Sequence, residues 1–380
     1  GGAVRDALLN RPVKDVDAAT PLAPDAVLAL LKKARIKALP TGIDHGTVTA
    51  VIGTRHCEIT TLRRDVSTDG RHAVVEYTDD WQQDAARRDF TMNALYLSPE
   101  GELFDYFGGA EDARAGRVVF IGNPEQRISE DYLRILRFFR FFAWYGEGAP
   151  DPEAITACAV LAQHIESLSG ERIREEMLKL LVAPGCGQTL EIMQHAKILR
   201  HALDFDVYGV GMFPRLAEIA ATTGKAPDIC LRVSGFVLEA GADIAAGEAL
   251  DILAARWRLP NAVTRDLDIL IRHQKAVRPS LTEAEQKRLL RKLGREHFTR
   301  TVIARWAAGS ESIAADHPYA AMLRLADTWE IPIFPVTGDD LIAIGIKPGK
   351  ELGALLEKLE EKWEKSDYRL SKRQLLAEIT

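Results

Sequence analysis

Two aspartates near the N-terminus, Asp15 and Asp17, have the spacing of a carboxylate pair on one face of a β-strand. Successive side chains of a strand point to opposite faces, so Val16 between them is expected to turn toward the core. Two like charges held close together are unfavourable unless a cation lies between them. Mg²⁺ takes one or two carboxylates together with substrate phosphates. The pair is a candidate magnesium site, although an isolated Asp-X-Asp more often marks an exposed strand edge.

A second feature of this segment is the pair Gly1-Gly2, which precedes a short predicted helix with Arg5 one turn in. The amides at a helix N-terminus can hold an anion such as a phosphate. Glu58, on a predicted neighbouring strand, is a candidate third carboxylate. A phosphate-binding turn beside metal-binding carboxylates suits nucleotidyl transfer, in which one metal ion holds the triphosphate and another lowers the pKa of an attacking hydroxyl.

The elements that would position these residues can be predicted from hydrophobic periodicity. Amphipathic patterns predict helices over 4–9 and 24–37, and strand patterns cover 15–19, 48–52 and 56–62. From about residue 113 onward the pattern is overwhelmingly helical. The sequence therefore predicts an α/β head followed by a long helical remainder.

Composition excludes some classes of protein but names no function. The 380 residues carry a net charge of −6, so a nucleic-acid ligand would need local basic patches. The 4 cysteines are scattered without a Cys-X-X-Cys pair, which argues against a zinc site and a disulfide framework. No apolar run is long enough to span a membrane, and the N-terminus lacks the pattern of a signal peptide. We therefore expect a cytoplasmic protein; its oligomeric state is not evident.

Several short motifs occur in the order typical of one enzyme family. They are GGAVRD, DVDAAT, PTGIDHGTVT, CEITTLRRD, RRDFTMNALY, DYFGGAEDARAGRVVFIGNP, EDYLRILRFFRF and ERIREEMLKLL. Together they resemble the class II CCA-adding enzymes, which are tRNA nucleotidyltransferases related to bacterial poly(A) polymerases. The C-terminal GDDLIAIGIKPGKELGALLEKLE is also similar to the tail of this family.

The resemblance implies an α+β fold, with a small nucleotidyltransferase head built on a mixed sheet and an all-α neck, body and tail. The implied boundaries are 1–115 for the head, 116–185 for a neck that recognises the base, 186–278 for the body and 279–380 for a tail that binds tRNA. Relatives usually have a helix and an apolar strand before Gly-Gly. Nothing precedes Gly1 here, which a trimmed chain would explain.

The resemblance also assigns the site residues. Asp15 and Asp17 would bind the catalytic Mg²⁺, and Glu58 fills the third-carboxylate position of the wider superfamily. The residues expected to bind the nucleotide are Gly2, Arg5, Arg88, Asp89, Asn93, Asp131, Arg134, Arg137 and Arg140. The substrates would be tRNA, CTP and ATP.

The motif EDYLR suggests how one site could accept both CTP and ATP. Asp131 and Arg134 are three residues apart, so on a helix they would share a face. Cytosine and adenine both present an amine donor beside a ring-nitrogen acceptor, which an aspartate and an arginine can pair. Uracil and guanine would leave both groups mismatched. Arg137 and Arg140 continue the stripe and suit phosphates, whereas the neighbouring aromatic residues are expected to form core.

Residues 63–79 are polar and contain glycine, and we interpret them as a mobile loop with Arg64, Asp65 and Arg71 as candidate switching contacts. In the family such a loop accompanies the change from C to A addition. The sequence thus favours full CCA synthesis. A poly(A) polymerase, a CC-adding enzyme and a non-catalytic RNA-binding scaffold remain alternatives.

Overall fold

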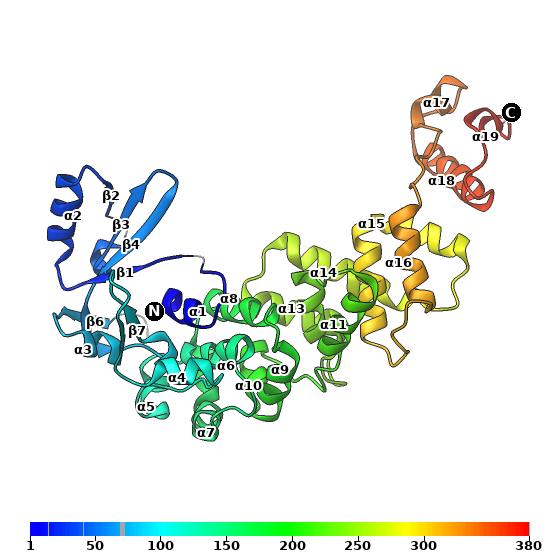
Figure 1. The fold of residues 1–380 in the computed structure, drawn as a ribbon. Coiled ribbons are helices and arrows are strands. Elements are labelled where there is room, and N and C mark those ends of the chain that lie inside the picture. Colours follow the sequence, from blue (N-terminus) through cyan, green and yellow to red (C-terminus); the bar gives the residue numbers. More distant parts are fainter. Residues whose placement is uncertain (14, 41, 69–72, 380) are drawn as a thin grey trace. The chain divides into compact units, whose positions relative to one another are not determined.

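The computed structural model describes residues 1–13, 15–40, 42–68 and 73–379, with only the backbone described at residues 44, 65–68 and 73–75. The chain forms two compact units (Figure 1). Unit 1 comprises residues 1–210 and 239–260, and unit 2 comprises residues 211–238 and 261–380. The division at residues 115, 185 and 278 into head, neck, body and tail stays a prediction.

Unit 1 begins with the predicted mixed sheet. Its four strands, in the order β1-β4-β3-β2, are β1 (Ala18–Thr20), β2 (Lys37–Leu39), β3 (Thr47–Ile52) and β4 (Arg55–Thr61). Strand β1 is parallel to β4, and the other two pairs are antiparallel. Helix α2 (Pro24–Lys33) packs on the sheet through Val27 and Leu31, which are buried with Val48 and Ala50. The mixed-sheet head predicted from the sequence is confirmed.

The first strand is shorter than its sequence pattern suggested. Residues 15–17 have no strand partner, and β1 begins where Ala18 pairs with Ile59. The expectation that Val16 turns toward the core was wrong, because its side chain is 61% exposed. The predicted short helix is present as α1 (Gly2–Leu8), and the strands predicted over 48–52 and 56–62 are β3 and β4.

The segment interpreted as a loop contains two strands. Strands β5 (Arg63–Thr68) and β6 (Ala73–Tyr77) pair antiparallel, with an irregularity in register between Asp65 and Ser67. A polar sequence can form a hairpin because the two strands hydrogen-bond to each other through their backbone N–H and C=O groups. The polarity of the side chains gives no sign of this pairing. Arg71 and the side chain of Asp65 lie outside the described part of the chain.

A compact group of short elements follows in unit 1. These elements are α3 (Trp81–Ala86), η2 (Thr91–Asn93), β7 (Leu95–Leu97), β8 (Leu103–Asp105) and α4 (Gly109–Arg114). Strands β7 and β8 form a two-stranded sheet. A Cβ atom on Gly109 would lie 2.0 Å from the carbonyl oxygen of Thr91, so only glycine lets α4 approach η2 this closely.

The rest of unit 1 is helical. Its elements are α5 (Pro124–Glu130), α6 (Leu133–Tyr145), α7 (Pro152–Leu161), η3 (Ala162–Ser167), α8 (Gly170–Leu181), α9 (Cys186–His195), α10 (Ile198–Leu203) and α13 (Ala246–Trp257). Helix α6 packs closely on α8. Phe138 and Phe139 are fully buried, and Phe138 stacks on Phe120. The four phenylalanines of α6 from Phe138 to Phe142 are buried, as predicted, whereas Trp144 and Tyr145 are only partly buried.

Unit 2 is built entirely from helices in its described residues. They are α11 (Met212–Thr223), α12 (Ile229–Leu238), α14 (Asn261–His273), η4 (Gln274–Ala276), α15 (Glu283–Ala307), α16 (Pro318–Thr328), α17 (Gly338–Ala343), α18 (Lys350–Lys365) and α19 (Lys372–Leu376). Trp306 and Tyr319 are fully buried in a core between α15 and α16. The last three helices enclose a separate small core around Trp363.

The close approach of α4 to η2 makes Gly109 a sensitive position. We expect Gly109→Ala to destabilise unit 1 by about 1–3 kcal/mol, because the methyl group must displace a backbone carbonyl in a packed region. Urea unfolding would measure the loss. Gly247→Ala is the matched control, since a Cβ there meets no atom within 4 Å and should leave the stability unchanged or slightly higher. Equal unfolding midpoints for the two variants would contradict this prediction.

Candidate active site

A pocket of about 650 Å³ lies in unit 1, within the size range of small-molecule sites. It is formed by α1, the start of β5, the segment before η2, the junction of α5 and α6, and α8. The lining residues are Gly1, Gly2, Arg5, Arg63, Arg87, Arg88, Asp89, Asn93, Asp131, Leu133, Arg134, Arg137, Phe141 and Arg172. Seven arginines against two aspartates make the pocket strongly electropositive. Such a site suits a polyanion such as a triphosphate.

Arg5 joins α1 to the rest of the pocket. Its guanidinium donates to Asn93 Oδ1 at 2.5 Å and to the hydroxyl of Tyr145 at 2.7 Å. It also lies over the Tyr145 ring, 4.1 Å from the centroid. The Arg5 side chain is only 8% exposed, so most of its hydrogen-bonding capacity is used within the protein. Arg5 therefore fixes the Gly1-Gly2 turn at the pocket edge.

Asp89 is buried and fully paired. Its Oδ2 accepts from Arg137 Nε at 2.7 Å, and its Oδ1 accepts from the Asn93 amide and the Phe90 backbone N–H, both at 2.9 Å. Burial acts to raise the pKa of Asp89, but Arg137 and the hydrogen bonds outweigh it and leave the pKa below its usual value. Asp89 thus stays ionised and holds Arg137 toward the pocket.

Arg88 has an unused donor at the pocket wall. Its terminal amine donates to Asp84 Oδ2 at 3.2 Å, whereas its Nε is buried and has no hydrogen-bond partner among the described residues. An unpaired buried donor is costly in a protein unless a ligand or water satisfies it. The side chain is 33% exposed, so an anion in the pocket can reach it.

Asp131 and Arg134 both line the pocket, but not in the way the sequence suggested. Helix α6 begins at Leu133, and Asp131 is extended at the end of α5. The expectation that the two residues share one helical face was therefore wrong. The Asp131 carboxylate instead accepts from Arg172 at 2.8 Å and from the backbone N–H of Leu133 at 3.1 Å. Arg134 donates to Glu130 at 2.5 Å.

Arg140 lies outside the pocket lining. Its Nε donates to Glu176 Oε2 at 2.5 Å, and Glu176 is buried on α8. Burial lowers the pKa of Arg140 despite this partner. The structure thus places Arg134 and Arg137 in the pocket, and Arg140 between α6 and α8.

The three candidate metal ligands do not line the pocket. Asp15, Asp17 and Glu58 are exposed. In the described part of the chain, no group of three or more His, Cys, Asp or Glu is arranged to hold a metal ion.

Some lining residues were not singled out from the sequence. Arg63, Arg87 and Arg172 line the pocket, and Asp84 holds two of the pocket arginines from behind. Arg87 directly precedes Arg88 in the same Arg-Arg-Asp motif, so the sequence could have identified it as a pocket residue. Asp84 precedes Arg87 and Arg88 by three and four residues, a spacing that favours ion pairs.

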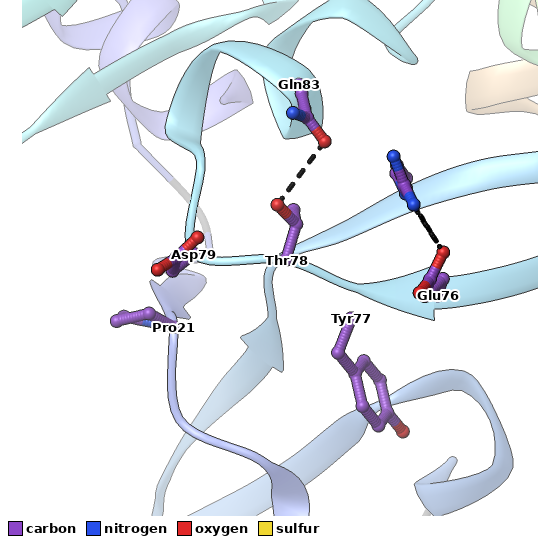
Figure 2. Close-up of a pocket in the computed structure, with 7 residues that line it drawn as sticks. Pro21, Glu76, Tyr77, Thr78, Asp79 and Gln83 are labelled. Carbon is purple, nitrogen blue, oxygen red and sulfur yellow. Dashed lines mark hydrogen bonds and ion pairs between the residues drawn. The ribbon is translucent and has the colours of Figure 1, made fainter.

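A second, smaller pocket of about 380 Å³ lies beside the β5–β6 hairpin (Figure 2). It is lined by Pro21, Arg64, Glu76, Tyr77, Thr78, Asp79 and Gln83. Arg64 forms an ion pair with Glu76 across the hairpin at 2.7 Å, and both side chains are more than half exposed. The candidate switching residue Arg64 is therefore paired within its own hairpin in this structure.

Comparison with known proteins agrees with this architecture. Residues 1–119 match the family described as "Poly A polymerase head domain", and residues 149–205 match "Probable RNA and SrmB- binding site of polymerase A". The human protein named CCA tRNA nucleotidyltransferase 1, mitochondrial, is 36% identical over 100% of this chain and 85% of its own length. The CCA-adding enzyme of Enterococcus faecalis is 29% identical over 95% of this chain and 86% of its own.

Solved structures of CCA-adding enzymes are also similar to this chain. The Bacillus stearothermophilus CCA-adding enzyme in complex with CTP superimposes with a TM-score of 0.75 at 27% identity, over 99% of this chain and 90% of that one. The Thermotoga maritima CCA-adding enzyme complexed with tRNA has a TM-score of 0.70 at 19% identity, over 100% and 90% of the two chains, and supports the fold.

The pairing of Asp89 predicts how the stability of unit 1 depends on pH. A carboxyl group whose pKa is lowered on folding stabilises the fold above its unfolded pKa of about 3.9 and loses that contribution at lower pH. We expect Asp89→Asn to cost about 3 kcal/mol at pH 7, because it leaves Arg137 without its carboxylate. The difference from the wild type should shrink as the pH falls toward 3.

Urea unfolding at several pH values measures this difference. Asp206→Asn is the control, because Asp206 forms an exposed ion pair with Arg200 that should contribute less than about 1 kcal/mol. A deficit in Asp89→Asn that stays constant between pH 7 and pH 3 would show that ionisation of Asp89 is not the cause.

Proposed function

The chain belongs to the family of CCA-adding enzymes, the CCA tRNA nucleotidyltransferases, and we propose that it adds C, C and A to the 3′ end of tRNA from CTP and ATP. The reaction is template-independent: the 3′-hydroxyl of the tRNA attacks the α-phosphate of the nucleotide and pyrophosphate leaves. The observation that carries the proposal is one pocket that combines Asp131 and Arg134 with a cluster of arginines.

We propose that Asp131 and Arg134 read the base. The Asp131 carboxylate accepts from the exocyclic amine that cytosine and adenine share, and Arg134 donates to the adjacent ring nitrogen. Uracil and guanine present a carbonyl and an N–H at these positions, so both protein groups would be mismatched. Each unpaired buried group costs about 1–3 kcal/mol, which is enough for useful discrimination.

The phosphates have a separate set of partners. Arg88 lines the arginine-rich pocket together with Gly1 and Gly2, and its buried Nε has no hydrogen-bond partner among the described residues. Asp89 holds Arg137 in the same pocket, and Asn93 bridges Asp89 and Arg5. We propose that Gly2, Arg5, Arg88 and Arg137 face the triphosphate, with Asp89 and Asn93 on the sugar side. Arg140 supports α6 from behind.

We propose that Mg²⁺ binds at Asp15 and Asp17. In the described part of the chain these acids and Glu58 do not form a ready-made ligand group; support for the proposal comes from the strand register, because Asp17 and Glu58 immediately precede the paired residues Ala18 and Ile59 of parallel strands. Parallel neighbours lie about 4.8 Å apart, and residues at the same level share a face of the sheet. Asp15 and Asp17 would hold the ion, and Glu58 could contribute. When bound, it stabilises negative charge on the phosphates and on the attacking oxygen.

We propose a cytoplasmic location. All four cysteines are free, as expected in a reducing compartment. In the described part of the chain, no helix has the length and apolar character to cross a membrane.

Primer extension tests the proposed activity. The purified protein is given a tRNA that ends before its CCA, Mg²⁺, and CTP and ATP singly and together. We expect growth by C, C and A, followed by arrest. A long adenosine ladder would instead identify a poly(A) polymerase, and two cytidines alone would identify a CC-adding enzyme. No extension, at the level of an Asp15→Ala, Asp17→Ala double variant, would identify a non-catalytic scaffold.

Loss of base reading should change nucleotide choice. We expect Arg134→Ala to lose about 10- to 100-fold in the preference for CTP over UTP, because the mismatched contact no longer penalises uracil. Competition between CTP and UTP in the extension assay measures this ratio. Arg272→Ala removes an exposed arginine of unit 2 and should leave the preference unchanged. Unaltered discrimination in Arg134→Ala would assign base reading to other residues.

A further inference from the structure

Asp84 lies behind the arginine-rich wall of the pocket and is 1% exposed. It belongs to α3 and does not line the pocket. Its Oδ1 accepts from Arg87 Nε at 2.9 Å and from the backbone N–H of Arg63 at 3.2 Å. Its Oδ2 accepts from the Arg88 terminal amine at 3.2 Å and from the hydroxyl of Tyr96 at 2.5 Å. Both carboxylate oxygens are thus used by protein donors.

The three arginines that contact Asp84 all line the pocket. Arg87 and Arg88 are adjacent in sequence, and their guanidinium groups share one carboxylate. Neighbouring guanidiniums repel each other, so without a charge between them each side chain would move toward solvent. A buried carboxylate with these partners holds both groups in one place before any ligand arrives.

The electrostatics agree with this geometry. Burial acts to raise the pKa of Asp84, but Arg87 and Arg88 together with the Tyr96 hydroxyl outweigh it and keep the pKa below its usual value. The pKa of Arg88 is raised, because Asp84 and Tyr96 outweigh the effect of burial. Both shifts favour the charged forms of the carboxylate and the guanidinium.

Asp84 occupies only one of the donor nitrogens of Arg88, so other donors of this guanidinium remain for a ligand. One terminal guanidinium nitrogen of Arg88, Nη2, donates to Asp84, and this contact restrains the guanidinium. The buried Nε has no partner among the described residues. A guanidinium restrained in this way can give its remaining donors to a phosphate with little further loss of conformational freedom.

We propose that Asp84 is a positioning residue, which holds Arg87 and Arg88 in the orientation that binds the triphosphate of the incoming nucleotide without touching the nucleotide itself. The inference rests on the proposed nucleotide site. It goes beyond that proposal because Asp84, which supports the pocket arginines, does not itself line the pocket.

Equilibrium binding tests the inference without catalysis. Dissociation constants of CTP, ATP and inorganic tripolyphosphate are measured for the wild type and Asp84→Asn in the absence of tRNA. We expect all three to rise by about tenfold, the lower end of what losing such a supporting partner costs in other binding sites. The factor should be the same for each ligand, since the phosphates are their shared part. Asp84→Glu, which keeps the charge, should recover part of the affinity.

Kinetics separate positioning from a loss of folded protein. Asp84→Asn should raise KM for CTP and ATP equally and leave the choice between bases unchanged, whereas partial unfolding would lower the apparent kcat alone. Asp228→Asn is the matched control, because it also removes the carboxylate partner of an arginine, Arg300, but lies in unit 2. It should bind tripolyphosphate like the wild type.

Three outcomes would overturn the inference: unchanged tripolyphosphate affinity in folded Asp84→Asn, weaker binding of only one of the two nucleotides, or no binding of tripolyphosphate by the wild type.

If Asp84→Asn does not fold, Tyr96→Phe replaces it, since it removes one hydrogen bond to Asp84 but keeps the charge. It should raise all three constants by a smaller, equal factor, and unchanged constants would overturn the inference. A wild type that binds tripolyphosphate but does not extend tRNA would reject the proposed function alone.

Discussion

The repulsion between guanidinium groups is the constraint on which the candidate active site depends. Seven arginines line one pocket, and each would move into solvent if nothing held it. For three of the seven, buried carboxylates prevent this: Asp84 holds Arg87 and Arg88, and Asp89 holds Arg137. A carboxylate that is itself buried needs several donors to stay ionised, so it forces its partners into fixed positions. The positive charge of the pocket is thereby built into the folding of unit 1.

Helix α6 shows how this constraint joins separate parts of the chain. Arg134, Arg137 and Arg140 form one stripe on this helix, but each is held by an acid from a different element. Glu130 is on α5, Asp89 precedes η2, and Glu176 is on α8. The aromatic side of the same helix is buried core. One helix therefore carries hydrophobic packing of unit 1 on one side and a row of acid-paired arginines, two of which line the pocket, on the other.

The sequence predicted those features that depend on local patterns. The α/β head, the short helix after Gly1-Gly2 and the packing role of the phenylalanines of α6 follow from local patterns, and the mixed sheet follows from the family resemblance. The β5–β6 hairpin was not predicted, because backbone pairing can stabilise polar segments that carry no alternating pattern. The Asp131–Arg134 geometry also failed, since nothing local shows that α6 begins two residues after Asp131. The spacing of Asp84 from Arg87 and Arg88 does predict ion pairs, but its burial and its contacts with Tyr96 and Arg63 depend on residues distant in sequence.

The carboxylate pair illustrates the limit of a strand-period argument. Asp15 and Asp17 were placed on one face because a strand was expected from residue 15, yet β1 begins only at Ala18. The pairing of Ala18 with Ile59 would place Asp17 beside Glu58 if the ladder continued by one residue. Each of these carboxylates would repel the other two, which opposes extension of the strand by one residue. A divalent cation between them reverses that sign, because it turns the repulsion that opposes the longer strand into attraction. If Mg²⁺ binds there as proposed, the charges that oppose a longer β1 would become its ligands.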